Sequence, residues 1–448
     1  MLKINKEKMI IVLSAVLFKI TLEYIYLYIL PNVIHKIYML NISFLRNAYS
    51  FNFNIIKYII SWIVFFLFLY FFLEKILYIN SKQNIGQVIL GVLFFMSFIP
   101  NIILFSFSNV EFTYLFFFLV YWGIFFYCSY IFFKRNWLLK KRLKYSKSII
   151  TLIITFFIIL SFFISYYYNN LKIYITIEDS IVYFKRFNSS FPKYINCFRN
   201  TAMFTIFPIT LVYFMKLKKI LFFSIIVYIQ LLLYSLDLQK TAVFLMGISV
   251  FGFICYKNKT KLICSIFLNL LEINIVTIIF YKFFNNLFFL NHVIKRIYFL
   301  PAIISNCYFL YVNENCKVIP FSTFFQQIGL IENYYYKYHG LPFHIGQKFF
   351  GSIKVSANTG GFGNAFSYGI IGVILIPICY ALILKILNII TVNLELSFLL
   401  PIIISMTFLI TGTSLISIIV IYGLLIGIIL LKLFNDLNDS RINKRGKK

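Results

Sequence analysis

Apolar runs of eighteen or more residues recur along the whole length of this chain. As a helix, each run is long enough to cross the roughly 30 Å hydrocarbon core of a bilayer. Hydrophobic residues make up 61% of the chain and charged residues only 12%, whereas a soluble domain has about 25% charged residues. The runs lack polar faces, and they lack the two-residue alternation of a membrane β-barrel. We therefore expect an all-α, polytopic membrane helical bundle.

The apolar runs predict twelve transmembrane helices in one integral membrane domain, residues 1–448. No internal repeat and no second, soluble domain is expected. The predicted helices cover about 9–30, 55–78, 85–107, 112–133, 148–168, 201–215, 220–236, 241–256, 262–281, 364–387, 396–411 and 414–433.

The formal net charge of +29 would suit a nucleic-acid partner, but a membrane protein explains it better. Basic residues collect in the cytoplasmic loops of such proteins and set their orientation. The segment KRNWLLKKRLKYSK, residues 134–147, carries seven basic residues and no acid, which predicts the cytoplasmic side. Counting outwards places both termini inside, so we expect a multi-pass protein of the bacterial inner (cytoplasmic) membrane that binds no nucleic acid.

Residues 283–312 are apolar but contain His292, Lys295, Arg296 and Pro301. If they crossed the membrane, the basic C-terminal end would lie outside, against the charge rule. We therefore expect an interfacial or re-entrant piece at the outer surface. With the loop that follows, it forms an external, periplasmic region at 283–363, between the ninth and tenth helices.

The stretch from about Asn313 to Gly372 is the longest that could not lie in lipid. We expect it to fold as an external loop over a site in the bundle. Its most specific string is SANTGGFGNAFSYGIIGV, whose small residues allow close helix contact. Asn358 in this string can cap a turn or bond a hydroxyl. No Gly-Lys-Ser/Thr follows, so it is not a phosphate loop.

Scattered cations are expected to converge on the outer face. A guanidinium binds phosphate or diphosphate with two parallel hydrogen bonds, and a lysine adds a point charge. The alternative is that each arginine reaches lipid headgroups or pairs with Glu178 or Asp179. Asp237 is expected to share one helix face with the lysine three residues later. The candidate diphosphate ligands are Arg186, Arg199, Lys240 and Arg296.

Histidines of the large loop are candidate general bases. His339 and His344 have side chains with an unperturbed pKa of ~6.5, suited to taking a proton from a sugar hydroxyl. Glu332 is a further candidate base, and the alternative for each histidine is a packing or solvation role. HGLPFH lacks zinc-ligand spacing, and the chain has no Asp-x-Asp, so we expect neither a metal nor another cofactor.

The chain resembles the O-antigen and capsular repeat-unit polymerases, a family of bacterial multi-pass membrane glycan polymerases. The resemblance covers about 235–375 and rests on KRIYFLPA at 295–302, on Lys240 and Thr241 opening a helix, on the large external loop, and on ANTGGFGNAFSYGIIGV at 357–373. The family often has Asp where Asn364 stands, Asn-Phe where Ser367 and Tyr368 stand, and a Gly before the basic residue near 240.

The resemblance implies transfer of a growing undecaprenyl-pyrophosphate-linked glycan onto a new lipid-linked repeat, outside the inner membrane and without metal. It also implies a chain-length regulator and a flippase as partners, besides membrane lipid. The four cations would bind the pyrophosphates, and His344, or else His339 or Glu332, would deprotonate the acceptor. The alternatives are an O-antigen ligase, an enzyme using lipid-phosphate sugars with Glu178 and Asp179, and a lipid-glycan flippase. A flippase would show internal repeats. The few mid-helix charges, at Lys19, Glu23 and Glu272, give little support for an ion-coupled pump.

Overall fold

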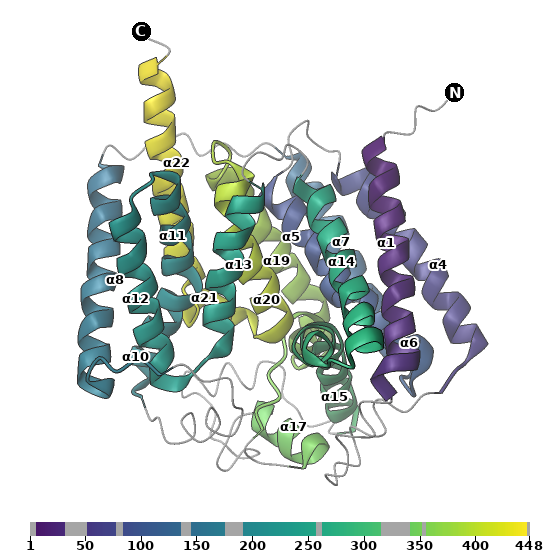
Figure 1. Ribbon diagram of the computed structural model, residues 1–448. Helices are drawn as coiled ribbons and strands as arrows, with labels where there is room; N and C mark the ends of the chain where they lie inside the picture. Colours follow the sequence, from purple (N-terminus) through teal and green to yellow (C-terminus); the bar gives the residue numbers. More distant parts are fainter. Residues whose placement is uncertain are drawn as a thin grey trace.

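The computed structural model describes residues 6–31, 52–77, 84–135, 145–174, 191–256, 262–314, 341–351 and 355–445. Every regular element in these ranges is a helix (Figure 1). Within them, nine helical stretches are long and apolar enough to cross a membrane. The expectation of an all-α, polytopic membrane protein is met at this level.

The N-terminal part of the bundle consists of helices that succeed each other with short connections. They are α1 (Lys6–Tyr24), η1 (Ile25–Ile29), α4 (Ile55–Phe71), η2 (Phe72–Leu77), α5 (Ile85–Leu93), η3 (Phe94–Phe98), α6 (Ile99–Phe107), α7 (Phe112–Lys134) and α8 (Ser146–Asn169). The elements named η are π-helical turns, which are wider than α-helical turns and continue the helix beside them.

The remaining helices build the other side of the bundle and its lower end. They are α10 (Lys193–Thr201), η4 (Ala202–Ile206), α11 (Phe207–Lys216), α12 (Ile220–Asp237), α13 (Lys240–Tyr256), α14 (Leu262–Phe284), η5 (Leu290–Phe299), α15 (Leu300–Glu314), α17 (Leu341–Phe350), α18 (Gly361–Phe366), α19 (Gly369–Ile390), α20 (Leu396–Gly412), α21 (Leu415–Val420) and α22 (Leu424–Arg445).

The beginning of α1 and the end of α22 lie at the same end of the bundle, the upper end in Figure 1. The turn between α11 and α12 lies at this end too. The turn between α12 and α13 lies at the opposite, lower end, together with α10 and α17. The elements that carry the candidate site residues Arg199, Lys240 and His344 are therefore at the end away from the chain's ends.

The structure contains most of the predicted helices, but the bounds of some of them differ from the prediction. Eight of the nine membrane-length stretches coincide with predicted helices, whereas α13 and α20 are shorter apolar helices. The sixth predicted helix extends back to Lys193 through α10 and η4. The tenth is broken before α19 at Gly369 (φ +67°), and the twelfth before α22 at Gly423 (φ +70°). Glycine allows both breaks because it adopts positive φ without steric cost.

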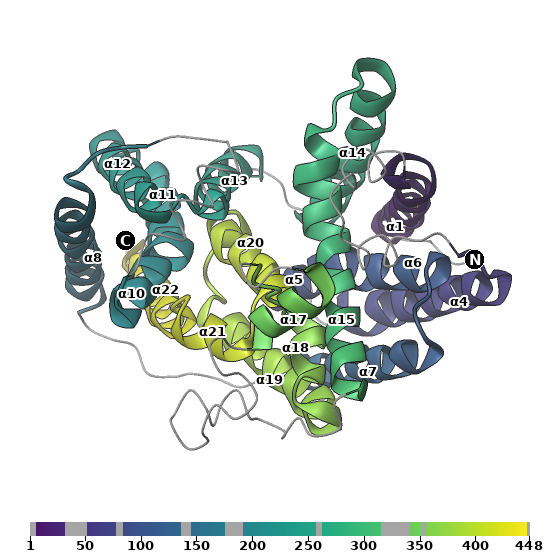
Figure 2. The ribbon, with the colours of Figure 1, turned by 90° about the horizontal axis from the view of Figure 1, so that it is seen from below.

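The ninth membrane-length stretch is the helix formed by η5 and α15, Leu290–Glu314. It is continuous through Pro301, which lies where the wide turns of η5 give way to α15. Figure 1 shows it nearly end-on below α5 and α14, whereas the neighbouring helices run up and down the page. Figure 2 shows it lengthwise across the lower end of the bundle. Its length and composition are those of a span, but its direction is across the bundle.

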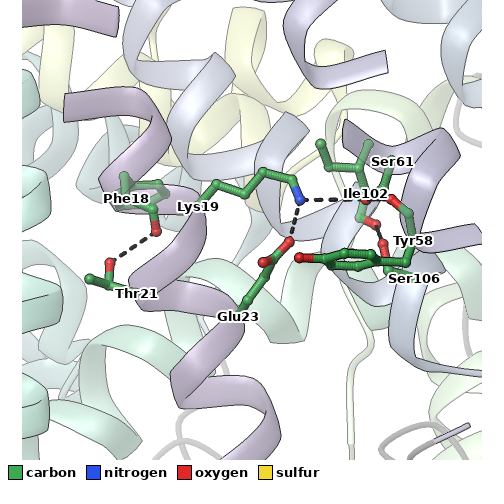
Figure 3. A network of polar contacts seen from close by, with 8 residues as sticks. All are labelled: Phe18, Lys19, Thr21, Glu23, Tyr58, Ser61, Ile102 and Ser106. Carbon is green, nitrogen blue, oxygen red and sulfur yellow. Dashed lines mark hydrogen bonds and ion pairs between the residues drawn. The ribbon is translucent and has the colours of Figure 1, made fainter. Parts of the chain in front are cut away.

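A buried ion pair within α1 ties this helix to α4 (Figure 3). The ammonium of Lys19 hydrogen-bonds to the carboxylate of Glu23, one turn later, and both side chains are buried. The Lys19 Nζ atom also lies 3.4 Å from Ser61 Oγ and 3.8 Å from the ring centroid of Trp62, both on α4. Charges inside a span are costly unless they are satisfied internally, and these contacts satisfy the lysine.

Candidate functional site

A buried ion pair joins α10 to the end of α12. The Nη2 atom of Arg199 lies 2.6 Å from Oδ2 of Asp237, and the two side chains are 3% and 7% exposed. The same Nη2 donates to Oδ1 of Asn196 at 2.7 Å. The guanidinium carbon lies 5.1 Å from the ring centroid of Phe191. A carboxylate, an amide and an aromatic ring together fix the orientation of the guanidinium.

The wide turn η4 directly follows α10, the helix that carries Arg199, and is held by side chains from two other helices. Nε2 of Gln230, on α12, donates to the carbonyl of Met203 at 3.1 Å. Oγ of Ser405, on α20, donates to the carbonyl of Phe204 at 2.8 Å. Donors that enter the hydrogen-bond ladder of a helix favour such a local widening. The segment after Arg199 is thereby fixed against α12 and α20.

The turn between α21 and α22 packs against the same segment. Oγ1 of Thr201 donates to the carbonyl of Ile421 at 3.2 Å, and Oγ1 of Thr205 donates to that of Tyr422 at 2.6 Å. A Cβ atom on Gly423 would lie 2.2 Å from Cγ2 of Thr201, so only glycine fits. Burial raises the pKa of the Tyr422 hydroxyl, and the nearby charges of Arg199 and Asp237 shift it in opposite directions.

Lys240 begins α13, immediately after the turn that Asp237 starts. Leu238 has a φ of +56° and reverses the chain, and the N–H of Gln239 donates to Oδ1 of Asp237 at 3.3 Å. The expectation that Asp237 and Lys240 share one helix face is therefore wrong, because the chain turns between them. They lie instead on two helices at one turn. We call Arg199, Asp237 and the half-buried Lys240 the α10–α13 corner.

The glycines of the most specific string serve close backbone packing. The N–H of Gly360 donates to the carbonyl of Thr411 at 3.3 Å. A Cβ atom on Gly360 would lie 2.2 Å from the carbonyl oxygen of Ile410, and one on Gly363 would lie 2.9 Å from Oγ of Ser305. The string thus joins α15 to the end of α20, as its small residues predicted.

The two asparagines of this string differ in their surroundings. Asn364 is buried, and its Oδ1 accepts a hydrogen bond from the N–H of Leu415, the first residue of α21, at 3.2 Å. An aspartate, which the resembled family often has at this position, could accept the same hydrogen bond from Leu415. Asn358 is exposed, and its Oδ1 accepts from Oγ of Ser356 at 3.1 Å.

His344 lies half-buried on α17, at the lower end of the bundle. Contacts to α15 and to the segment before α18 hold this helix. Lys348 forms an ion pair with Glu314 at the end of α15, and the carbonyl of Pro342 accepts from the N–H of Ala357 at 3.0 Å. The histidine was expected on a loop, but its side chain stands on a short helix that is attached to α15.

The other predicted site residues are distributed as follows. Arg296 is exposed on η5, which packs against α6, α14 and α15. Arg296 and Arg199 therefore lie in different parts of the bundle. Arg186, Glu332 and His339 lie outside the described residues. Among the residues that the structure describes, no group of three or more His, Cys, Asp or Glu side chains could hold a metal ion.

Two residues around the site, Asn196 and Tyr422, carry no motif and could not be predicted. The sequence predicts Lys240 as the neighbour of Asp237, whereas the structure pairs Asp237 with Arg199. Only the polar character of Asn196 could have pointed to that residue.

Comparisons with protein-family models, curated proteins and solved structures give no match for this chain. The helical fold and the apolar composition define a polytopic α-helical membrane protein. A fixed guanidinium pairs with a carboxylate, and a lysine three residues after that carboxylate begins the next helix, at the end of the bundle opposite the beginning of α1 and the end of α22.

Proposed function

We propose that this protein is a metal-independent membrane glycosyltransferase. It joins undecaprenyl-pyrophosphate-linked oligosaccharide repeat units into O-antigen or capsular polysaccharide at the outer face of the bacterial inner membrane. The α10–α13 corner is the observation that carries the proposal. A buried, oriented guanidinium, with a lysine three residues along the chain from its carboxylate partner, suits the diphosphate of a lipid-linked sugar. Asp237 holds the guanidinium in place, since it bonds to the same Nη2 as Asn196.

The positive charges of Arg199 and Lys240 support the following reaction. A hydroxyl of the acceptor sugar attacks the anomeric carbon of the donor sugar, and the bond from that carbon to the diphosphate oxygen breaks. The diphosphate leaves with the bonding electrons, and Arg199 and Lys240 stabilise its charge. The hydroxyl proton passes to His344 as general base, with His339 and Glu332 as the other candidates. Arg186, Arg296 and Asn358 remain candidate ligands of the two substrates.

The proposal requires the lower end of the bundle to face outward. Lys172 follows α8 at the lower end, and Lys218 lies in the turn between α11 and α12 at the upper end. In a cysteine-free background, we expect a membrane-impermeant maleimide to label Lys172→Cys in intact spheroplasts and to label Lys218→Cys only after lysis. The reverse pattern would place the site in the cytoplasm and refute the proposal.

Activity is tested in a strain that lacks the gene. We expect carrier-linked glycan to be reduced to one repeat in this strain and to be restored to long chains by the wild-type gene. Arg199→Lys, which keeps the charge but loses the fork, and Lys240→Ala should leave single repeats. Lys172→Ala removes an exposed lysine at the same end and serves as the matched control, so it should give long chains.

The same strain separates a polymerase from a ligase. Loss of a ligase would leave long chains on the carrier lipid, whereas loss of a polymerase leaves one repeat. Long chains in both Arg199→Lys and Lys240→Ala, at wild-type protein levels, would exclude the α10–α13 corner from the reaction.

A further inference from the structure

The turn between α14 and η5 projects beyond its neighbours at the edge of the molecule (Figure 2). Asn285, with a φ of +48°, ends α14, and the N–H of Asn286 donates to the carbonyl of Phe280 at 3.1 Å. The side chain of Asn286 then accepts from the N–H of Phe288 at 2.8 Å. These bonds pair backbone groups at the C-terminus of α14 and just before η5, so the turn has a defined conformation. We call residues 282–296 the α14–η5 elbow.

Three phenylalanines of the elbow present their rings outward. Phe283, Phe284 and Phe288 are 78%, 68% and 55% exposed. Phe289, in contrast, packs on Phe280 with a centroid distance of 5.1 Å and holds the elbow against α14. Exposed apolar rings at the end of a membrane-length helix suit the boundary between headgroups and acyl chains.

Cations accompany these rings. Lys282 is exposed, with Nζ 5.2 Å from the ring centroid of Tyr24, and on η5 Arg296 is exposed and Lys295 half-buried. The sequence has no Asp or Glu between Glu272 and Glu314. Cationic side chains beside inserted rings are the arrangement by which surface helices bind anionic lipid.

We propose that the α14–η5 elbow is a docking site for an anionic phospholipid at the lower surface of the bundle. Its phenylalanine rings enter the acyl boundary, and the charges of Lys282, Lys295 and Arg296 attract the anionic headgroup. Charge complementarity favours an anionic headgroup, and the position at the end of a membrane-length helix favours a lipid over a soluble anion. The site shares Arg296 with the candidate substrate ligands named above but involves no residue of the α10–α13 corner, so lipid quenching and glycan chain length test the two proposals separately.

The test uses the full-length protein in liposomes. Phe288→Trp introduces a reporter, whose signal is the difference in fluorescence from the parent chain. Phosphatidylglycerol or phosphatidylcholine brominated on its acyl chains is added at increasing mole fraction. We expect stronger quenching by the brominated phosphatidylglycerol. Changing Lys282, Lys295 and Arg296 to Gln in this background should raise the half-saturating mole fraction by about fivefold for each cation removed.

Phe116→Trp is the matched control, because Phe116 is 62% exposed on α7, outside the α14–η5 elbow. It should be quenched equally by both lipids. Equal quenching by both lipids at residue 288 would overturn selection of an anionic headgroup. No quenching there would overturn contact of the elbow with the membrane.

Discussion

Arg199 and Asp237 form an ion pair of 2.6 Å that is almost completely buried and connects α10 with the last residue of α12. The pair joins segments that are distant in the sequence, at the end of the bundle where α17 also lies. Because the carboxylate binds one nitrogen of the guanidinium, the pair both links the two helices and orients the guanidinium.

The first prediction concerns this link. Arg199→Ala leaves the carboxylate of Asp237 buried without its partner, which costs about 3–5 kcal/mol. Arg199→Met with Asp237→Leu removes both charges and should recover most of this loss. Thermal unfolding of the purified protein in detergent measures both effects. Equal destabilisation by the single and the double substitution would show that the two residues are not coupled.

The pair within α1 gives a second prediction. Glu23→Gln leaves the Lys19 ammonium buried without its carboxylate, and we expect destabilisation of about 3–5 kcal/mol. Lys19→Met with Glu23→Gln should be clearly more stable than Glu23→Gln alone. The measurement is again the midpoint of thermal unfolding, and Lys8→Met, which removes a lysine of a partly exposed pair, is the control.

A third prediction contrasts two glycines. A Cβ atom on Gly360 would lie 2.2 Å from a backbone oxygen that cannot move away cheaply, whereas Gly123 has nothing within 4 Å of that position. Gly360→Ala should therefore reduce the amount of folded protein recovered by size-exclusion chromatography. Gly123→Ala should stabilise α7 by roughly 0.5–1 kcal/mol, because alanine favours a helix over glycine. The close packing of Gly360 would be refuted by a wild-type yield of Gly360→Ala.

The fourth prediction tests what Asn364 contributes. Its Oδ1 accepts from the N–H of Leu415, so Asn364→Ala leaves that buried N–H unpaired at a cost of about 1–3 kcal/mol. Asn364→Asp keeps the acceptor and should retain the folded yield and most of the stability. If aspartate destabilised the protein as much as alanine, the amide nitrogen and not the oxygen would be the group required.

Long apolar helices could be predicted from the sequence because an apolar run of eighteen or more residues indicates a membrane-spanning helix. The positions of α5, α7, α8 and α14 follow from this rule alone. The start of the sixth helix could not be predicted in the same way. The residues from Lys193 to Thr201 are too polar for an apolar run, and tertiary contacts of Arg199 and Thr201 keep them helical.

The site could be predicted only in part, because spacing along the chain reports neighbours on one helix. It led to Lys240 for Asp237, whereas the carboxylate pairs with Arg199 on a helix 38 positions earlier in the numbering. The glycine string was singled out correctly for close packing, but its partners at Ile410 and Ser305 come from other helices. No local pattern contains such pairings.

The attachment of α17 to α15 has a consequence for how this architecture diversifies. Residues 315–340 lie between Glu314 and α17 in the sequence, and the ion pair of Glu314 with Lys348, near the end of α17, connects the two flanking helices. An inserted or exchanged segment would start and finish on the same fixed frame. A different stretch could thus be grafted between α15 and α17 without changing the helices that carry it.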